Sequence, residues 1–228
     1  MAQASYQSVR WNQDLSLGIT RSTAVDPGPG EVQLAVGSVG ICGSDLHFYR
    51  KDFPARAGVV PGHEFAGIVS AVGKGVKYLA EGDLVGVEPL TRCGQCVFCL
   101  SGDYHICVDR ALIGERYDGG MSEFAVVPAI TAFKAPTGVD GELAALAEPL
   151  ACSVHGFAKV RLRGNETVFI LGAGSIGLTA VIAAKACGAK VIVLARHPHQ
   201  QAAARRLGAD EVIGEDEAGD ARVADLRK

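Results

Sequence analysis

The sequence lacks the features that would point to nucleic acid or secretion. Its 22 lysines and arginines are outnumbered by 25 acidic residues, which gives a net charge of −3. No basic face for nucleic acid is therefore expected. The first residues, MAQASYQSVRW, contain no apolar core, so no signal peptide is expected. Seven cysteines without such a signal favour a reducing, cytoplasmic compartment, where cysteine clusters bind metal more often than they form disulfides.

A convincing membrane span is also lacking. Residues 167–184 carry no charge and approach the length of a spanning helix. However, the run opens with a β-branched stretch and is interrupted by Gly172, Gly174 and Gly177. A buried strand, a glycine turn and a buried helix explain it better, and no membrane partner is expected. With 48% apolar and 21% charged residues over 228 positions, the chain is expected to form one large globular domain or two modest ones.

The chain up to about Pro136 consists of short apolar runs separated by turns. The runs are LSLGIT, EVQLAVGSVG, EFAGIVSAVG, DLVGVEP and EFAVVP. No helical pattern is evident between them, so an antiparallel, barrel-like β domain is predicted. Glycines inside the runs, at 37, 67 and 86, indicate bulges or corners where the sheet bends.

Four cysteines in this region form the most specific motif of the chain: Cys93, Cys96, Cys99 and Cys107. Four thiols in so compact a lobe predict a closed tetrahedral shell around a structural Zn²⁺, which would fold a loop that is poor in apolar residues. An iron–sulfur cluster also uses four cysteines, but it favours other spacings and usually a trailing Cys-Pro, whereas Val108 follows Cys107 here.

The stretch from Gly40 to Glu64 indicates a second, catalytic metal site. Cys42, His63 and Glu64 offer a thiolate, an imidazole and a carboxylate, which suit Zn²⁺. Twenty residues separate the cysteine from the histidine, so a folded β framework has to bring them together. The glycines at 40, 43 and 62 are expected in tight turns with positive φ.

After Thr137 the pattern becomes helical. Asp140 is placed to cap a helix, and Pro149 suits the first turn of a second one. Glu148 is a carboxylate in an apolar stretch, so it is either a zinc-facing group or a solvated first-turn glutamate. The cysteines at 152 and 187 and the histidine at 155 are expected in the helix cores.

A glycine-rich turn follows the strand that begins at Thr167. Between this strand, the following helix and a second strand at 190–195, a G-x-G-x-x-G motif is the fingerprint of dinucleotide binding, with the pyrophosphate at the helix N-terminus. Its residues are Gly172, Gly174, Ser175, Ile176 and Gly177.

In this order, GICGSDLH, PGHEFAGIV, the four cysteines and LAEPLAC before GAGSIG resemble the zinc-containing medium-chain dehydrogenase/reductase family, especially its polyol and threonine dehydrogenase branch. The resemblance implies a GroES-like β-barrel catalytic domain (1–155) and an incomplete Rossmann domain, a doubly wound parallel sheet (156–228). It implies a zinc-dependent alcohol or polyol dehydrogenase that uses NAD or NADP. The full-length parent is expected to be a homo-oligomer.

The resemblance also assigns roles to residues. The zinc ligands would be Cys42, His63 and Glu64, with Glu148 at or near the same metal. Ser44 would pass the alcohol proton outward and His47 would accept it near solvent. The hydride would go to a nicotinamide ring.

Two departures from the family pattern matter. The acidic residue expected about 20 positions after the fingerprint is replaced by Ala195 and Arg196, and no acidic residue occurs from 167 to 209. This favours NADP over NAD. The family also continues well beyond position 228, so the chain is expected to be a C-terminally truncated, inactive fragment. The alternative is a zinc-stabilised binding or regulatory module without turnover.

Overall fold

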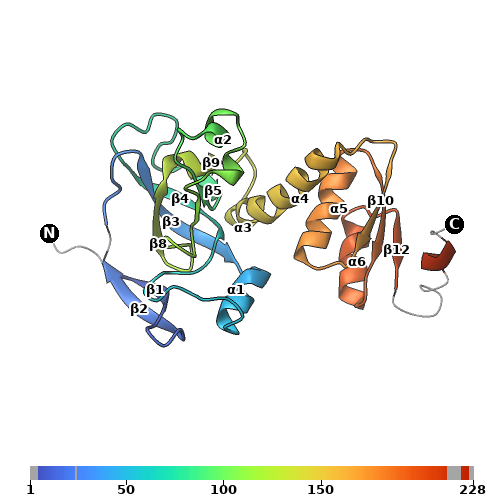
Figure 1. Cartoon of the computed structure of the whole chain (residues 1–228), viewed down its shortest axis with the longest axis horizontal. Coiled ribbons are helices and arrows are strands. Elements are labelled where there is room, and N and C mark those ends of the chain that lie inside the picture. The colour runs from blue at the N-terminus through green and yellow to red at the C-terminus, as the bar shows by residue number, and fades with distance from the viewer. Residues whose placement is uncertain (1–4, 24, 215–221, 226–228) are drawn as a thin grey trace. The chain divides into compact units, whose positions relative to one another are not determined.

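The computed structural model describes residues 5–23, 25–214 and 222–225, and the chain divides into two compact units, Met1–Glu148 and Pro149–Lys228. Figure 1 shows a β-rich first unit and a second unit in which helices alternate with strands. The predicted boundary between residues 155 and 156 falls inside helix α4 (Ala147–Val160). Among the described residues, no helix combines the length and the apolar composition that a membrane span requires.

The first unit is organised around a five-stranded antiparallel sheet in the order β8-β3-β4-β5-β9. All five runs predicted as strands are strands or contribute to one, so the antiparallel prediction is confirmed. The sheet encloses a core of aliphatic side chains and Phe65, which is fully buried. Its strands are β3 (Glu31–Gly40), β4 (Glu64–Val72), β5 (Leu84–Val87), β8 (Phe124–Pro128) and β9 (Ala132–Lys134).

Short helices complete this unit, and the sequence pattern did not predict those that precede Thr137. A seven-residue helix, α1, follows β3, and a four-residue helix, α2, lies in the cysteine lobe. Helices this short span two turns or fewer, so they leave no apolar periodicity to read. The helical elements are α1 (Gly43–Tyr49), α2 (Val97–Leu100), η1 (Tyr104–Ile106), η2 (Ala129–Thr131) and α3 (Gly141–Ala145). Asp140 caps α3 as predicted, since its Oδ1 accepts from Leu143 N at 2.8 Å.

The prediction of bulges or corners at the strand glycines is confirmed at Gly37, whereas Gly86 pairs regularly with both neighbouring strands. Gly37 lies at a register shift between β3 and β4. A Cβ at Gly67 would lie 2.5 Å from Ala35 O across the strands, and one at Gly86 would lie 2.8 Å from Ala144 O in α3. These two positions therefore need glycine because another backbone approaches closely.

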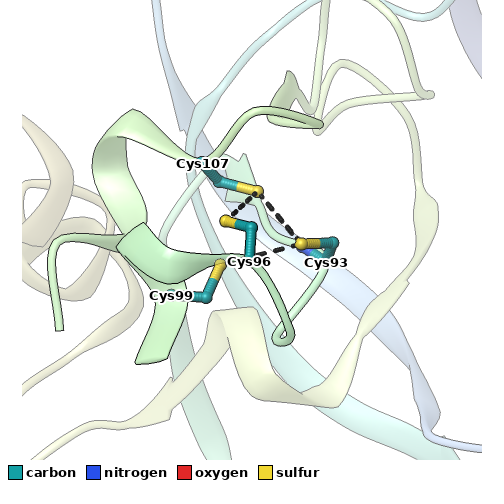
Figure 2. Close-up of side chains that lie close together, drawn as sticks. All are labelled: Cys93, Cys96, Cys99 and Cys107. Carbon is teal, nitrogen blue, oxygen red and sulfur yellow. Dashed lines mark hydrogen bonds between the residues drawn. The ribbon is translucent and has the colours of Figure 1, made fainter. Parts of the chain in front are cut away.

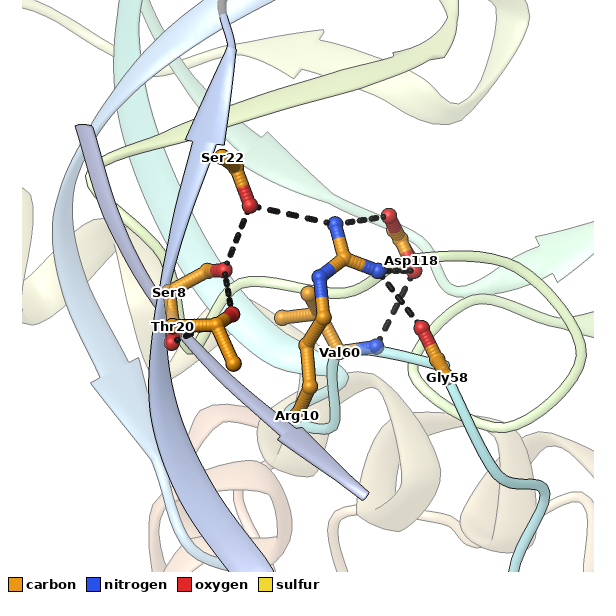
Figure 3. Close-up of polar contacts among 7 residues, drawn as sticks. All are labelled: Ser8, Arg10, Thr20, Ser22, Gly58, Val60 and Asp118. Atoms are coloured by element: carbon orange, nitrogen blue, oxygen red, sulfur yellow. Dashed lines mark hydrogen bonds and ion pairs between the residues drawn. The ribbon is translucent and has the colours of Figure 1, made fainter. Parts of the chain in front are cut away.

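The N-terminal hairpin of β1 (Ser5–Trp11) and β2 (Leu17–Thr23) is attached to the sheet unit by polar contacts. Figure 3 shows Arg10 reaching Gly58 O at 2.6 Å and both carboxylate oxygens of Asp118, at 3.1 and 2.9 Å. Asp118 also accepts from Val60 N at 3.0 Å. The ion pair joins the hairpin to the loop at Asp118, and hydrogen bonds with the same two side chains hold the segment that leads to His63. A further short ladder pairs β6 (Leu90–Thr91) with β7 (Ala111–Leu112).

The second unit contains a parallel sheet in the order β10-β11-β12, with β10 (Thr167–Leu171), β11 (Lys190–Leu194) and β12 (Glu211–Ile213). Helices α5 (Ser175–Ala186) and α6 (Pro198–Arg206) connect the strands. The uncharged run at 167–184 is thus a strand, a glycine turn and part of a helix, as predicted, but the strand is not the buried one expected, since only Ile170 in β10 is buried.

Three predicted core residues of the helices are exposed instead. Helix α4 buries Pro149 and Ser153, and Cys152 lies off that face. His155 is exposed on the same helix. Cys187 follows the last residue of α5 as its C-cap and is exposed as well. The apolar composition of these two segments did not indicate which face of each helix would be buried.

Candidate metal centres and cofactor turn

The four predicted lobe cysteines converge on one point. Figure 2 shows their sulfur atoms directed toward a common centre from the loop before α2, from α2 itself and from the end of η1. The Sγ–Sγ distances are 4.0 Å for Cys93–Cys99, 3.9 Å for Cys96–Cys107 and 3.6 Å for Cys107–Cys93. A tetrahedral site with Zn–S bonds of 2.3 Å requires sulfur separations of about 3.8 Å. The donor set therefore fits one tetrahedral ion.

Backbone amides favour the thiolate form of two of these cysteines. The N–H groups of Val108 and Cys99 lower the pKa of Cys96 to about 6. The N–H groups of Cys93 and Asp109, both 3.4 Å from the Cys107 sulfur, lower the pKa of Cys107. Desolvation raises the pKa of Cys99 to about 12 in the absence of metal. Because thiolates are the metal-binding form, the lobe holds part of the negative charge that a dication would neutralise.

Cys42, His63 and Glu64 form the second group of convergent ligand atoms, which all lie within 4.8 Å of one another. Strands β3 and β4 bring them together, since Gly40 pairs with Glu64 in the antiparallel register. Cys42 then follows β3 as the N-cap of α1, at the same end of the sheet. His63 and Glu64 are only 6% and 9% exposed. Three protein ligands is the number that catalytic zinc sites use, with water or substrate as the fourth ligand.

Glycines support this site, though not all in the predicted way. Of the three glycines expected at positive φ, only Gly62 adopts it, at φ 92°. A Cβ at Gly40 would displace the Glu64 carboxylate from its present place, and Gly43 simply begins α1. The constraint at position 40 therefore comes from the Glu64 side chain on the neighbouring strand β4 and not from a turn.

A loop that the sequence did not single out fixes the chain before His63. The N–H groups of residues 119, 120 and 121 donate to the carbonyls of Val60, Gly62 and Pro61 at 2.8, 2.8 and 3.0 Å. A Cβ at Gly119 would collide with Gly62 O. The Asp-Gly-Gly sequence at 118–120 was the available signal, because consecutive glycines permit close contact between two backbones.

Asp45 is a second residue that sequence reasoning missed. It is 8% exposed, and its Oδ2 accepts from Cys42 N at 2.8 Å. Its Oδ1 lies 3.8 Å from His63 Nδ1. The Cys-x-x-Asp spacing at a helix N-terminus, where a residue at N3 reaches back to the N-cap amide, was the signal that could have found it.

Helix α1 carries the two residues assigned to the proton relay. Ser44 and His47 are three positions apart, so they lie on one face of the helix. Ser44 is half-buried and His47 is half-exposed.

A cavity of about 350 Å³ adjoins Glu64 and is also lined by Ser38, Val39, Gly40, Glu142, Ala145 and Leu146.

Glu148 is not part of either ligand group among the described residues. It lies in the first turn of α4 and is partly exposed. The structure therefore brings together three of the four residues predicted at the catalytic metal.

The glycine turn of the second unit has the geometry of a dinucleotide site. Gly172 has φ 98°, and its N–H donates to Leu194 O at 3.0 Å, which places the turn beside the end of β11. A Cβ at Gly177 would collide with Gly172 O, so the helix can approach the turn only with glycine at that position. Ser175 and Ile176 form the first turn of α5. At the end of β11, Ala195 is fully buried and Arg196 is exposed.

Two family models match the chain. The alcohol dehydrogenase GroES-like domain matches residues 28–137, and the zinc-binding dehydrogenase model matches residues 175–228. The chain belongs to the zinc-containing medium-chain dehydrogenase family. The fold class predicted from the sequence, a GroES-like domain followed by a partial Rossmann domain, is confirmed.

Members of this dehydrogenase family resemble the chain over most of its length. A sorbitol dehydrogenase of Halalkalibacterium halodurans is 36% identical over 89% of this chain and 58% of its own length. An L-threonine 3-dehydrogenase of Pyrococcus abyssi is 41% identical over 82% of this chain and 55% of its own. The chain thus spans little more than half the length of these relatives.

Solved family structures carry both kinds of nicotinamide cofactor. An NADP-bound zinc-binding dehydrogenase of Sinorhizobium meliloti is 34% identical, with a TM-score of 0.89 over 96% of this chain and 64% of that chain. An NADH-bound alcohol dehydrogenase (rspB) of Escherichia coli is also 34% identical, with a TM-score of 0.88 over 98% of this chain and 66% of that chain.

Proposed function

We propose that the chain contains the zinc-binding part and the start of the dinucleotide-binding part of an alcohol or polyol dehydrogenase. The reaction is hydride transfer between a secondary alcohol and a nicotinamide cofactor. The observation that carries the proposal is the convergence of Cys42, His63 and Glu64 within 4.8 Å beside a helix that bears Ser44 and His47. The relatives named sorbitol and threonine dehydrogenases support an alcohol as substrate.

In this proposal two zinc ions bind, one in the cysteine lobe and one at the Cys42 group. A bound zinc ion would supply Lewis-acid chemistry that lowers the pKa of the substrate hydroxyl, and a nicotinamide ring would supply the hydride acceptor. Ser44 accepts the alcohol proton and passes its own to His47. His47 is half-exposed and can return the proton to water. Glu148 is proposed as a further carboxylate near the same metal.

We further propose that the parent protein prefers NADP. An acidic residue at the end of β11 would bind the ribose hydroxyls and repel a 2′-phosphate, but Ala195 is buried there and Arg196 follows it on the surface. A guanidinium forms charge-assisted hydrogen bonds with phosphate worth about 1.5–3 kcal/mol. Arg196→Ala should therefore lower kcat/KM with NADP by roughly 10- to 150-fold and leave NAD kinetics nearly unchanged. Equal efficiency with both cofactors, unaffected by Arg196→Ala, would refute the preference.

The decisive experiment compares the 228-residue chain with a version extended by the downstream coding region. We expect the chain itself to bind metal without measurable turnover, because its parallel sheet has three described strands and the nicotinamide of a doubly wound fold lies across strands on both sides of the switch point. The extended protein should oxidise secondary alcohols or polyols. Metal binding without turnover in the extended protein would instead favour a zinc-stabilised module without catalysis. Polyol oxidation by the isolated 228-residue chain would show that the catalytic unit ends earlier than proposed.

A further inference from the structure

A close contact at the end of α1 involves a residue with no assigned role. His47 Nδ1 lies 2.8 Å from Oδ2 of Asp52, and both side chains are half-exposed. The Phe53 ring lies against the same imidazole, with ring centroids 5.3 Å apart and planes tilted by 52°. The imidazole of His47 is thus held at one edge by a carboxylate and along one side by an aromatic ring.

The backbone that brings Asp52 to His47 is unusual. Asp52 N donates to His47 O at 2.9 Å, and Lys51 N donates to Phe48 O at 3.0 Å, which is the hydrogen-bond pattern of a Schellman helix end. The residue between helix and return is left-handed in this motif and is usually glycine. Here it is Lys51, with φ 65°. The same pattern, with Arg161 at φ 54° in the left-handed position, ends α4, so the feature that distinguishes the end of α1 is that its turn brings Asp52 back to His47.

We propose that Asp52 is a positioning residue for the proton relay. A carboxylate 2.8 Å from Nδ1 accepts the hydrogen of that nitrogen, so the neutral imidazole carries its proton on Nδ1 and its free lone pair on Nε2. This inference rests on the proposed function, in which His47 accepts a proton from Ser44. Without Asp52 the imidazole would divide between two tautomers and two ring orientations, and a smaller fraction would present Nε2 to the relay.

The proton balance of the step is complete. The substrate O–H proton goes to Ser44 Oγ as the Ser44 hydroxyl proton goes to Nε2 of His47, and a bound nicotinamide would accept the hydride. The imidazolium then holds a proton on each nitrogen, and its charge faces the Asp52 carboxylate. Loss of the Nε2 proton to water restores the starting tautomer. Asp52 exchanges no proton with the substrate in this step and acts only through His47.

The test is the ring-nitrogen NMR spectrum of the whole chain labelled with ¹⁵N-histidine, recorded near pH 9, where imidazoles are neutral. The His47 signals are assigned by their loss in His47→Gln. We expect the Nδ1–H tautomer to predominate, and Asp52→Ala to shift the tautomer ratio several-fold toward Nε2–H. Lys51→Gly is the matched control: it relieves the backbone strain, keeps the carboxylate, and should leave the ratio unchanged.

Two results would overturn the inference: an Nε2–H tautomer in the unaltered chain, or a ratio that Asp52→Ala does not change. Failure of the proposed function would look different. Undiminished turnover of His47→Gln in the extended protein would remove the relay, whatever the tautomer is. Circular dichroism of Asp52→Ala distinguishes a local effect from unfolding, and we expect an unchanged spectrum because exposed ion pairs contribute little to stability.

Discussion

The Asp45 carboxylate connects two predicted ligands of one metal: its Oδ2 accepts the backbone N–H of Cys42 at 2.8 Å, and its Oδ1 lies 3.8 Å from Nδ1 of His63. The hydrogen bond to Cys42 N fixes the start of α1, and the longer electrostatic contact with His63 restricts how that ring can turn. A buried carboxylate in this position orients both ligands before any metal binds.

Asp45→Asn should therefore weaken zinc binding at the Cys42 group by about 10- to 100-fold, which is typical when a group that orients a ligand is lost. The zinc of the cysteine lobe should be unaffected. Competition with a chromogenic chelator measures both sites. Asp14→Asn is the control, since the carboxylate of Asp14 accepts from the amide and hydroxyl of Ser16 in the turn between β1 and β2. Unchanged affinity in Asp45→Asn would show that Asp45 serves only the helix end.

Cysteine substitutions should separate the two metal sites. Cys96→Ser removes one of four convergent sulfurs, and because a structural zinc contributes folding free energy directly, we expect loss of soluble, folded protein. Cys42→Ser should leave folded protein with one zinc per chain in place of two. Cys187→Ser alters an exposed cysteine outside both groups and should change neither folding nor metal content. Less than one equivalent of zinc in well-folded, unaltered protein would contradict the assignment of the lobe.

Gly62→Ala should destabilise the first unit by more than a matched glycine substitution does. Both Gly62 and Gly75 have positive φ, at 92° and 91°, so alanine costs about 1–3 kcal/mol of backbone strain at either position. At Gly62 the new Cβ would also lie 2.8 Å from side-chain carbons of Met121 and Val39, whereas nothing lies within 4 Å at Gly75. Chemical denaturation followed by the fluorescence of Trp11, the single tryptophan, measures the difference. Equal losses of the free energy of unfolding in the two variants would mean that Met121 and Val39 move away from the new Cβ without an energetic cost.

Asp210 should make the stability of the second unit depend on pH in the acidic range. The Lys185 ammonium, 2.9 Å from Asp210 Oδ2, and the Val191 N–H lower the pKa of Asp210 below 3.8. A carboxyl whose pKa is lower in the folded state stabilises that state fully above its unfolded pKa, and this contribution disappears as the pH falls through the folded value. Asp210→Asn should thus unfold more readily than the unaltered chain at pH 7 but not at the most acidic pH that keeps the fold. Hydrogen exchange of the Val191 amide reports this locally, with Asp225→Asn as the exposed control.

Local patterns carried much of the information about fold and site. The four lobe cysteines lie within 15 consecutive positions, 93–107. Binding of one shared ion is therefore one of the few arrangements in which so short a segment brings four sulfur atoms together. The glycine turn between β10 and α5 is similarly local, and its close contact between residues 172 and 177 follows from the motif itself. The strands of the first unit could be predicted because each forms a short apolar run bounded by turn residues.

What the sequence alone determined was therefore which residues could bind metal and cofactor, because that depends on side-chain chemistry and short spacing. The tertiary structure decided which of them meet. The register of β3 against β4 brings Cys42 to His63 across 20 intervening residues, and it makes Gly40 a contact of Glu64 instead of a turn. Burial on one face of α4 left Cys152 exposed. Asp45 and Asp52 lie near the two ends of the seven-residue helix α1. The hydrogen bonds at these ends return the Asp45 carboxylate to Cys42 and the Asp52 carboxylate to His47.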